Sequence, residues 1–507
     1  MTTPLLVILA FILVSTVVGV IGRGRGVMNL ERWSVGGRQF GVILVWLLMA
    51  GEIYTTFTFL GASGWAYSRG APSFYILAYG TIGYIISFFL LPPLWRMAKR
   101  LGLHTQPDFF LARYDSPALA GLVALIGVVS IVPYLQLQLA GLGLIVHTAS
   151  GGAIASEVAI IVAFALTCVF VYTSGLQGIA WVAIIKDITM VVVVVIIGIG
   201  LPSMYFGSVG QMLSELVRQH PSHLTFPGGT TTMGVGWVIS TILLTGVGFY
   251  CWPHMFASAF SAKDERTIKR NAVIMPLYQL PILLVFFVGF TALLVMPGLK
   301  NPDTALLALV TRSYPAWFAG LVGGAGAVTA MVPASMLLLV ASTLTAKNIY
   351  RPLRGGAVSE EQLMRASRGF MLLIAVVALI LAIWSPNELV KLLIFGYDGI
   401  AQFFPGIVLG VFVRRITARP VIFGLVAGEA VVVSLIWSGH DPFLGMNAGF
   451  VGLLVNALVT LLSATWGQVL NHREIHDSRP DPITQLKFGG EHGEPGGRDR
   501  VDGWRAG

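Results

Sequence analysis

Charged residues are scarce in this chain of 507 residues. Asp, Glu, Lys and Arg together make up 11% of it, whereas hydrophobic residues make up 56%. Soluble globular domains carry about 25% charged residues, so this composition excludes an ordinary soluble protein. Apolar runs of roughly 20 residues, the length that a helix needs to cross hydrocarbon, recur almost from end to end. The sequence therefore predicts an all-α polytopic membrane protein that spans the lipid bilayer.

Cysteines are also few, and recognisable catalytic motifs are absent. The two cysteines, Cys168 and Cys251, lie inside apolar runs and have no metal-ligand spacing around them. No HExxH pair, nucleophile elbow with plausible partners or Walker motif occurs, so the motifs that membrane hydrolases and transferases use are missing. The net charge of +9 comes from cations in short loops beside apolar runs, which is a topology signal. We therefore expect that the protein is not an enzyme and binds no cofactor or metal. We also expect no nucleic-acid partner and no obligate protein partner.

The apolar runs give about thirteen predicted transmembrane helices when they are divided at Gly, Pro and charged residues. The cation-rich loops all fall on one side of this arrangement. If that side is cytoplasmic, the N-terminus lies outside and the C-terminus inside the cell membrane. The predicted transporter domain is 1–467. The polar tail, 468–507, has too little apolar surface to build a core and is expected to be disordered.

One carboxylate interrupts the second predicted span, which runs from Trp46 to Ser68. Glu52 lies near its middle, and a charge at bilayer depth costs about 2.5 kcal/mol or more. Gly51 precedes it, and the residues that follow have poor helix propensity and several hydroxyl groups. These hydroxyl-bearing residues are Tyr54, Thr55 and Thr56. A helix could open here and offer backbone groups to a ligand; the alternative is an interior carboxylate that only bonds a neighbouring helix.

The seventh predicted span carries a matching interruption at Gly246, Gly248 and Pro253. Transporters with inverted repeats often place substrate at the bilayer midplane between two helices broken at corresponding positions. The two interrupted spans are five apart. We therefore expect a five-plus-five inverted repeat with flanking helices, the first repeat covering 44–201 and the second 235–413.

The first repeat also sets the expected position of two charged residues. Its fifth span is predicted as Val158 to Thr173 and its sixth as Ile188 to Leu201. Lys186 and Asp187 fall between these spans. They are therefore expected in a cytoplasmic connection.

Several other polar residues occur inside predicted spans. Gln136 and Gln138 are two positions apart on one helix and point to different faces, so one could line a cavity while the other packs against a neighbour. For each of these residues, interhelical hydrogen bonding is the alternative to a functional role. The remaining members of this set are Tyr134, Tyr250, His254, Tyr397, Asp398, Gln402 and Glu429.

Six sequence segments, in order along the chain, resemble the sodium/solute symporter family. They are SVGGRQFG, TQPDFFLARYDSP, TSGLQGIAWVAIIKDITM, SAKDERTIKRNA, VASTLTAKNIYRP and YDGIAQFFPGIVLG. The resemblance implies the leucine-transporter fold, a five-plus-five inverted repeat with additional helices. Within the family the chain is most similar to the monocarboxylate permease branch, through GEIYTTFTF, VPYLQLQLAG, WPHMF and AMVPASMLLLVASTLTAKNIYRP. Members of that branch carry short organic acids such as lactate, pyruvate, acetate or propionate.

One departure from the family bears on the coupling ion. Sodium-coupled members generally supply adjacent Ser and Thr hydroxyls from the ninth span, where this chain has Val332 and Pro333. Ser335, Ser342 and Thr343 remain nearby, but such hydroxyls often bond their own helix backbone. A buried carboxyl group can hold a proton at neutral pH, so Glu52 is a candidate for the coupling site.

These observations predict a secondary active importer of a small monocarboxylate, coupled to H⁺ or Na⁺. The expected substrate contacts are Tyr54, Thr55, Thr56, Gln136, Tyr250 and Trp252. The expected ion-coupling residues are Glu52, Ser335, Ser342 and Thr343. Two alternatives stay open: a sodium-coupled symporter of another solute, such as an amino acid or vitamin, and a channel or membrane sensor.

Overall fold

A computed structural model describes residues 3–22, 30–385, 388–413 and 415–471. Most of the predicted polar tail, 472–507, lies outside the described residues. Every long element within them is a helix. The first half comprises α1 (Thr3–Gly22), α2 (Leu30–Val35), α3 (Val42–Gly51), α4 (Ala62–Ser68), α5 (Tyr75–Leu101), α6 (Gln106–Tyr114), α7 (Pro117–Ala149), α8 (Ser156–Phe206) and α9 (Val209–Gln219). The second half comprises α10 (Val235–Gly248), α11 (Pro253–Phe260), α12 (Glu265–Gln279), α13 (Ile282–Val295), α14 (Ala305–Ser313), α15 (Ala316–Leu344), α16 (Arg351–Leu353), α17 (Glu360–Trp384), α18 (Leu389–Ile400), α19 (Phe404–Phe412), α20 (Ala418–Trp437) and α21 (Ala448–Asn471).

The number of membrane crossings agrees with the sequence prediction. Across the described ranges, eleven helices are long and apolar enough to span a bilayer, and a bent pair, Val235–Cys251 with Pro253–Phe260, raises this number to twelve. The predicted thirteenth crossing is then the interrupted segment formed by α3 and α4. Both irregular crossings are the spans in which the sequence indicated a break.

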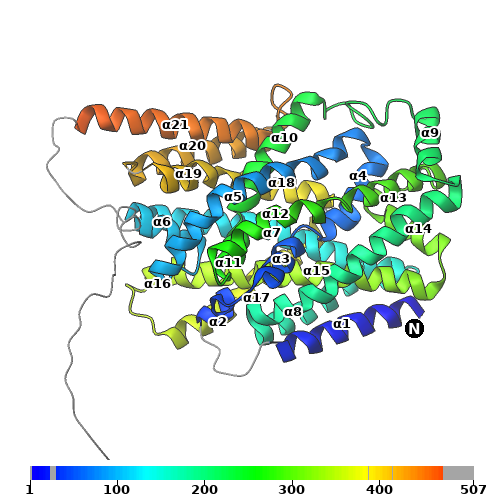
Figure 1. Ribbon diagram of the computed structural model, residues 1–507, viewed down its shortest axis with the longest axis horizontal. Coiled ribbons are helices and arrows are strands. Elements are labelled where there is room, and N and C mark those ends of the chain that lie inside the picture. Colours follow the sequence, from blue (N-terminus) through cyan, green and yellow to red (C-terminus); the bar gives the residue numbers. More distant parts are fainter. Residues whose placement is uncertain (1–2, 23–29, 386–387, 414, 472–507) are drawn as a thin grey trace, which may run out of the picture.

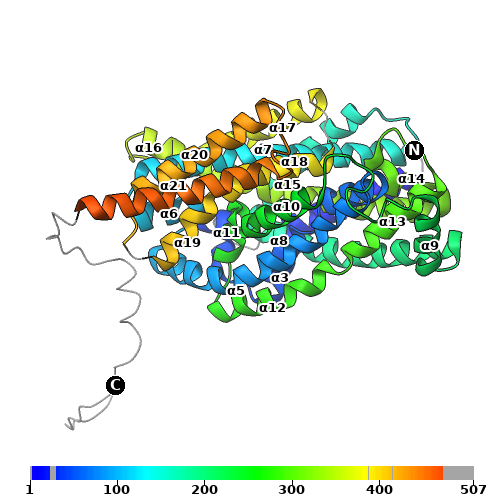
Figure 2. The same ribbon diagram turned by 90° about the horizontal axis from the view of Figure 1, so that it is seen from above.

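The helices form one elongated bundle. In Figure 1 the start of α1 and the end of α21 lie at opposite ends of it, as an odd number of crossings requires. The short helices of the cation-rich connections, α2, α6 and α16, lie toward the end where α21 finishes, and α9 lies at the other end. Figure 2 shows α20 and α21 side by side along one flank. The cytoplasmic assignment of the basic end stays a prediction.

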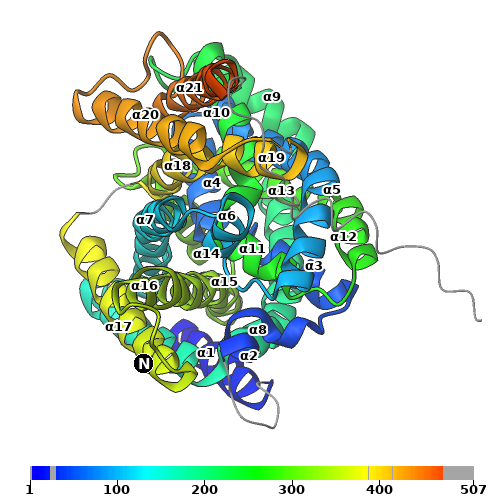
Figure 3. The ribbon, with the colours of Figure 1, turned by 90° about the vertical axis from the view of Figure 1, so that its left-hand side faces the viewer.

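The α15 helix runs through the interior of the bundle, and its apolar window is completely buried. Seen along the bundle, α11 and α15 lie inside a rim that includes α1, α17, α20 and α12 (Figure 3). Small residues permit this close packing. A Cβ at Gly320 would lie 2.8 Å from Pro4 Cα, and one at Gly326 would lie 2.8 Å from a ring carbon of Phe59.

The expected connection at Lys186 and Asp187 is wrong. The turn lies earlier, at Gly175, whose φ of 58° interrupts α8 and separates the crossings Ser156–Thr173 and Gly175–Phe206. Both charged side chains are instead buried inside the second of these crossings. Two adjacent charged residues are typical of a loop, which is why the sequence predicted one here. In the fold, Lys186 Nζ and Asp187 Oδ1 lie 3.3 Å apart and form an ion pair with no net charge.

Candidate functional site

The first interruption separates α3 from α4. The α3 helix ends at Gly51, Glu52 is its C-terminal cap, and helical structure resumes as a π-helical turn, Phe57–Gly61, that leads into α4. Threonine hydroxyls replace the lost helical hydrogen bonds: Thr58 Oγ1 donates to the Ile53 carbonyl at 2.8 Å and accepts from the Thr55 amide at 3.0 Å. The predicted opening of this helix is confirmed.

The second interruption separates α10 from α11. A short 3₁₀ turn, Phe249–Cys251, follows α10, and Trp252 then adopts an extended conformation before Pro253 begins α11. The two halves are bent by 46°. Proline suits this position because its missing N–H is one of the amides that a helix start leaves unpaired. This interruption is also confirmed.

The two interruptions meet at a nearly closed internal cavity with only about 10 Å³ of free space. Glu52 enters it from the first interruption, and Trp252 and His254 enter it from the second. The full lining is Glu52, Phe57, Tyr79, Tyr134, Phe249, Trp252, His254, Met255, Leu393 and Tyr397. That space is about what one water molecule needs, so a solute can bind between the interruptions only when the lining residues move apart.

Glu52 and His254 approach each other inside the cavity. Glu52 Oε2 lies 3.4 Å from His254 Nε2, and both side chains are almost completely buried. In the described part of the chain, neither carboxyl oxygen of Glu52 has a hydrogen-bond partner. Its backbone carbonyl accepts from the Tyr134 hydroxyl at 3.3 Å. The carboxyl group is therefore aimed into the cavity and is not fixed by the bundle around it.

Aromatic rings form the wall opposite Glu52. The Trp252 ring centroid lies 5.2 Å from that of Tyr134 and 5.3 Å from that of Tyr397. Tyr397 also lies edge-on to Tyr79, at 6.0 Å between centroids. Tyrosine and tryptophan combine an apolar ring with a polar tip, so this wall can exclude water and still present donors to a solute.

Five of the six predicted contacts do not line the cavity, although all five are buried. Tyr54 packs its ring edge-on to Tyr278 at 4.8 Å, and Tyr250 packs against Phe249 at 4.9 Å. The Thr55 hydroxyl accepts from a backbone amide of the interruption at 3.2 Å. The Thr56 hydroxyl donates a hydrogen bond to Gln138 of α7. Of the predicted substrate contacts, Trp252 alone is part of the lining.

The two glutamines of α7 divide as their spacing predicts, but Gln138 is the one that faces the interruption. Its Oε1 accepts the Thr56 hydroxyl at 2.8 Å. The Gln136 amide instead donates to the carbonyls of Leu381 and Ser385 at 3.1 and 2.7 Å, at the end of α17. The structure thus directs Gln136 away from the position expected for it.

The hydroxyls predicted for ion coupling on α15 bond their own helix. Ser335 donates to the Met331 carbonyl at 2.6 Å, and Thr343 donates to the Leu339 carbonyl at 2.7 Å. Ser342 donates to the Leu339 carbonyl as well, at 3.0 Å. None of the three lines the cavity. The described residues also contain no group of three or more His, Cys, Asp or Glu side chains arranged for a metal ion.

A wider hollow of about 400 Å³ is lined by cationic residues at the end of α4 and on α18. Arg69 and Lys391 both contribute to it, and both contact Glu388, Arg69 at 3.0 Å and Lys391 at 3.1 Å. Trp65, another lining residue, lies 5.9 Å from the ring of Tyr75. Tyr75 in turn neighbours Tyr79 of the central cavity, at 6.3 Å. These rings connect the cationic hollow with the cavity.

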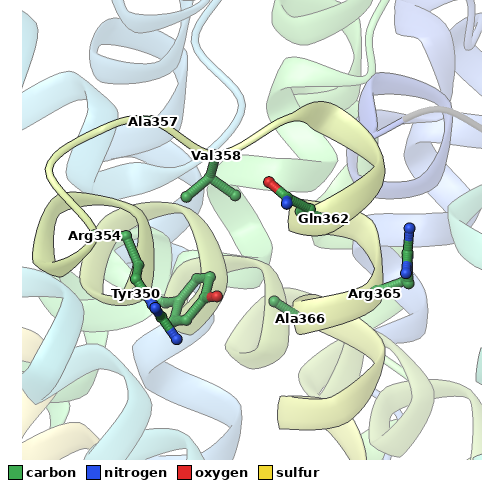
Figure 4. Close-up of a pocket in the computed structure, with 7 residues that line it drawn as sticks. All are labelled: Tyr350, Arg354, Ala357, Val358, Gln362, Arg365 and Ala366. Atoms are coloured by element: carbon green, nitrogen blue, oxygen red, sulfur yellow. The ribbon is translucent and has the colours of Figure 1, made fainter.

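Another hollow, of about 560 Å³, lies at the connection between α16 and α17. Figure 4 shows Arg354 beside the ring of Tyr350, and Gln362 and Arg365 on α17. The Arg354 guanidinium lies 5.4 Å from that ring centroid, and Arg365 is paired with Glu361 at 2.8 Å. This surface belongs to neither interruption, so it is not the transport site.

Two interrupted helices that meet at a cavity inside a membrane-spanning bundle define a secondary transporter. A solved Na⁺-coupled sialic acid symporter, in a substrate-bound outward-open state, superposes on this chain with a TM-score of 0.77 at 16% identity, covering 93% of this chain and 98% of that one. This similarity establishes the leucine-transporter fold. Residues 33–428 match the Sodium:solute symporter family, and the chain belongs to that family. It is a solute symporter, not an enzyme.

Relatives within the family span nearly the whole chain. The uncharacterized symporter YhjB of Bacillus subtilis is 41% identical over 474 residues, covering 91% of this chain and 96% of the relative. A monocarboxylate transport permease protein of Rhizobium johnstonii is 26% identical over 478 residues, covering 91% and 96%. A sodium/proline symporter of Staphylococcus aureus is 22% identical over 478 residues, covering 90% and 91%. These matches support the resemblance seen in the sequence segments.

The sequence analysis did not select most of the residues that line the cavity. His254, Tyr134 and Tyr397 were recognised only as polar residues within spans, and Tyr79 was not singled out. A signal for His254 was present, since it directly follows Pro253 at the second interruption, as Glu52 directly follows Gly51 at the first. No comparable signal identified Tyr79, because its position on the cavity depends on how α5 packs.

Proposed function

We propose that this symporter imports a small monocarboxylate together with a proton, and that Glu52 carries the proton. The observation that carries the proposal is the placement of the Glu52 carboxyl group in the cavity, beside His254 and without a hydrogen-bond partner among the described residues. An ionised carboxylate in such surroundings is costly, since burial without compensating hydrogen bonds penalises charge. A protonated carboxyl group avoids that cost.

The position of Glu52 in the cavity lining supplies a mechanism for coupling. A substrate carboxylate bound among the lining residues would lie close to Glu52. Two negative charges in one buried site repel each other, so the pair holds a proton more firmly than either group alone. The anion therefore enters a site in which Glu52 is protonated, and the loaded carrier moves one anion together with one proton.

Recognition of the anion is assigned to the second interruption and the aromatic wall. The first turn of α11 borders the cavity through His254 and Met255. A helix N-terminus carries partial positive charge and favours a carboxylate. Tyr134, Trp252 and Tyr397 present polar tips beside apolar rings, which suits a carboxylate attached to a short carbon chain. Thr55, Thr56 and Gln138 are proposed to keep the interruption open.

The cationic hollow is proposed as the route by which solute reaches the cavity. Arg69 and Lys391 both contact Glu388, and Asp441 lines the same hollow, so these four formal charges balance. The route is proposed because Arg69 and Lys391 can each donate charge-assisted hydrogen bonds to a passing carboxylate. Trp65, Tyr75 and Tyr79 stand between the hollow and the cavity and are the rings that would move during access.

The topology proposed with this function has an outward N-terminus and a cytoplasmic C-terminus in the cell membrane. The clustering of basic connections at one end of the bundle supports this orientation. The two repeats are proposed to be 44–201 and 235–413, because each begins with its interrupted helix. They lie within a transporter domain of residues 1–467.

A sodium-coupled symporter of another solute is the second candidate, and the sodium/proline relative favours it. A panel of labelled solutes distinguishes the two candidates. Proteoliposomes with purified protein are given lactate, pyruvate, acetate, propionate or proline under either a pH gradient or a sodium gradient. We expect saturable uptake of a monocarboxylate, driven by the pH gradient and reduced by the other short acids in competition. Uptake of proline that requires sodium would refute the proposal.

A further inference from the structure

The buried amine of Lys186 lies at the first interruption. Lys186 belongs to α8, and its side chain is completely inaccessible to solvent. An unpaired ammonium inside a bilayer costs several kcal/mol, so its presence there needs an explanation. Its contacts supply one.

The ammonium group binds two backbone carbonyls of the first interruption. It donates hydrogen bonds to the backbone carbonyl of Gly51 and, at 3.0 Å, to that of Tyr54. Its third contact is Asp187 Oδ1, at 3.3 Å. An ammonium has three donors and no acceptor, so these three oxygens satisfy it completely. Asp187 Oδ1 is held in turn by the Tyr278 hydroxyl at 2.7 Å.

This set of oxygens has the chemistry of a cation site. In secondary transporters, the backbone carbonyls that an unwound helix exposes are the groups that coordinate a coupling cation. Here two such carbonyls and a carboxylate surround the Lys186 nitrogen. Gly51 permits the approach, because a Cβ at that position would lie only 3.0 Å from Nζ.

Within the described residues, no hydroxyl of α15 donates to these two carbonyls, and the Thr329 hydroxyl has no hydrogen-bond partner at all. Val332 and Pro333 have no hydroxyl group, and the Ser335 hydroxyl donates to its own helix at 2.6 Å. The carbonyls of the interruption are thus satisfied by a covalently attached cation from α8.

We propose that Lys186 is a built-in cation that occupies the site at which a metal ion would otherwise bind the first interruption. The attached ammonium holds the opened segment in shape at all sodium concentrations, so the carrier needs no sodium ion there. Asp187 keeps the site neutral overall. The inference rests on the proposed function only in taking sodium as unnecessary for coupling.

The test measures ion binding directly and requires no substrate. The melting temperature of the purified full-length protein is recorded in sodium chloride and in choline chloride at equal ionic strength. A ligand that binds only the folded state raises the melting temperature in a saturable way. We expect no specific sodium effect for the wild type and a saturable sodium-specific rise of a few degrees for Lys186→Ala, which vacates the site. Ammonium chloride should stabilise Lys186→Ala in the same way.

Two further variants define the site. Lys186→Ala/Asp187→Asn removes the anionic ligand as well, and its sodium response should be lost. Lys269→Met removes an exposed lysine, paired with Glu265 at 2.8 Å, and should behave as wild type. If Lys186→Ala cannot be purified folded, Lys186→Gln, which retains most of the side-chain length, should show the sodium response instead.

Two results would overturn the inference. One is a saturable sodium effect on the wild type that Lys186→Ala retains unchanged. The other is the absence of any sodium or ammonium effect on the folded Lys186 variants. Because neither result involves solute uptake, failure of this inference can be told apart from failure of the proposed monocarboxylate transport.

Discussion

Glu52 Oε2 lies 3.4 Å from His254 Nε2, and each residue belongs to one of the two interrupted helices. The contact joins the end of α3 to the first turn of α11, at the cavity where the two interruptions meet. Any motion that separates the two interruptions must also separate these two side chains. We propose that the pair couples the protonation of the cavity to its geometry.

Replacement of Glu52 by Gln should abolish accumulation but spare exchange. A pH gradient of one unit supports about tenfold accumulation when one proton moves with one solute, since one pH unit corresponds to about 1.36 kcal/mol. Glu52→Gln should reduce that ratio to one, because an amide cannot release a proton, while exchange of labelled for unlabelled solute continues. Glu429→Gln, a change in a half-buried acid that does not line the cavity, serves as the control. Undiminished accumulation by Glu52→Gln would remove this residue from the mechanism.

His254 should act on transport through Glu52. His254→Gln removes a titratable ring from the contact, so the pH dependence of uptake should change. The double variant His254→Gln/Glu52→Gln should lose less gradient-driven uptake than the sum of the losses in the two single variants. Residues in contact interact energetically, so their effects are not additive. Strict additivity would show that the 3.4 Å contact carries no functional coupling.

The two glutamines of α7 should differ in their effects. Gln138→Ala deletes the acceptor of the Thr56 hydroxyl and loosens the interruption. The loss of a hydrogen bond worth about 1 kcal/mol should raise KM roughly fivefold. Gln136→Ala removes hydrogen bonds to the end of α17 and should lower the melting temperature with little change in KM. Equal KM values for Gln138→Ala and the wild type would contradict this division of roles.

His104, in the connection between α5 and α6, should make the protein sensitive to acid. Burial and the neighbouring Lys347 ammonium lower the pKa of His104 to about 4, from 6.5. The unfolded chain therefore binds this proton at a higher pH than the folded protein does, and stability is lost as the pH falls from 6.5 toward 4. The loss attributable to this residue approaches about 3 kcal/mol at the acid end.

Thermal unfolding of His104→Gln from pH 7 to pH 4.5 checks this expectation. The variant should lose less stability than the wild type over that range, whereas His440→Gln, which changes an exposed histidine, should match the wild type. Identical acid sensitivity in His104→Gln and the wild type would contradict the assigned cause.

Much of the fold could be predicted from the sequence because membrane helices leave strong signals. Apolar length located the spans, and the residues around Glu52 and Pro253 located both interruptions. Lys186 and Asp187 were misplaced because charge alone was taken to mark a loop, although opposite charges can neutralise each other inside a bundle. The contact of Lys186 with the Gly51 and Tyr54 carbonyls depends on the packing of α8 against α3, which no local pattern encodes.

The candidate site was predicted less completely than the fold. Glu52 and Trp252 were identified from the interruptions, since each is next to a helix-breaking residue. The sequence showed that Gln136 and Gln138 face different directions, but the choice between them depends on the rotation of α7 about its axis. Tyr79 lines the cavity through the packing of α5, and Tyr54 and Tyr250 turn away from it for similar reasons.

The coupling of proton and solute movement tests the central claim most directly. Proteoliposomes that contain a pH-sensitive dye receive external lactate or pyruvate in sodium-free buffer, with protein-free liposomes measuring passive entry of the neutral acid. We predict internal acidification above the passive rate, in step with uptake of labelled solute, and its loss in Glu52→Gln. Solute uptake that requires sodium and leaves the internal pH at the protein-free rate would contradict proton coupling through Glu52.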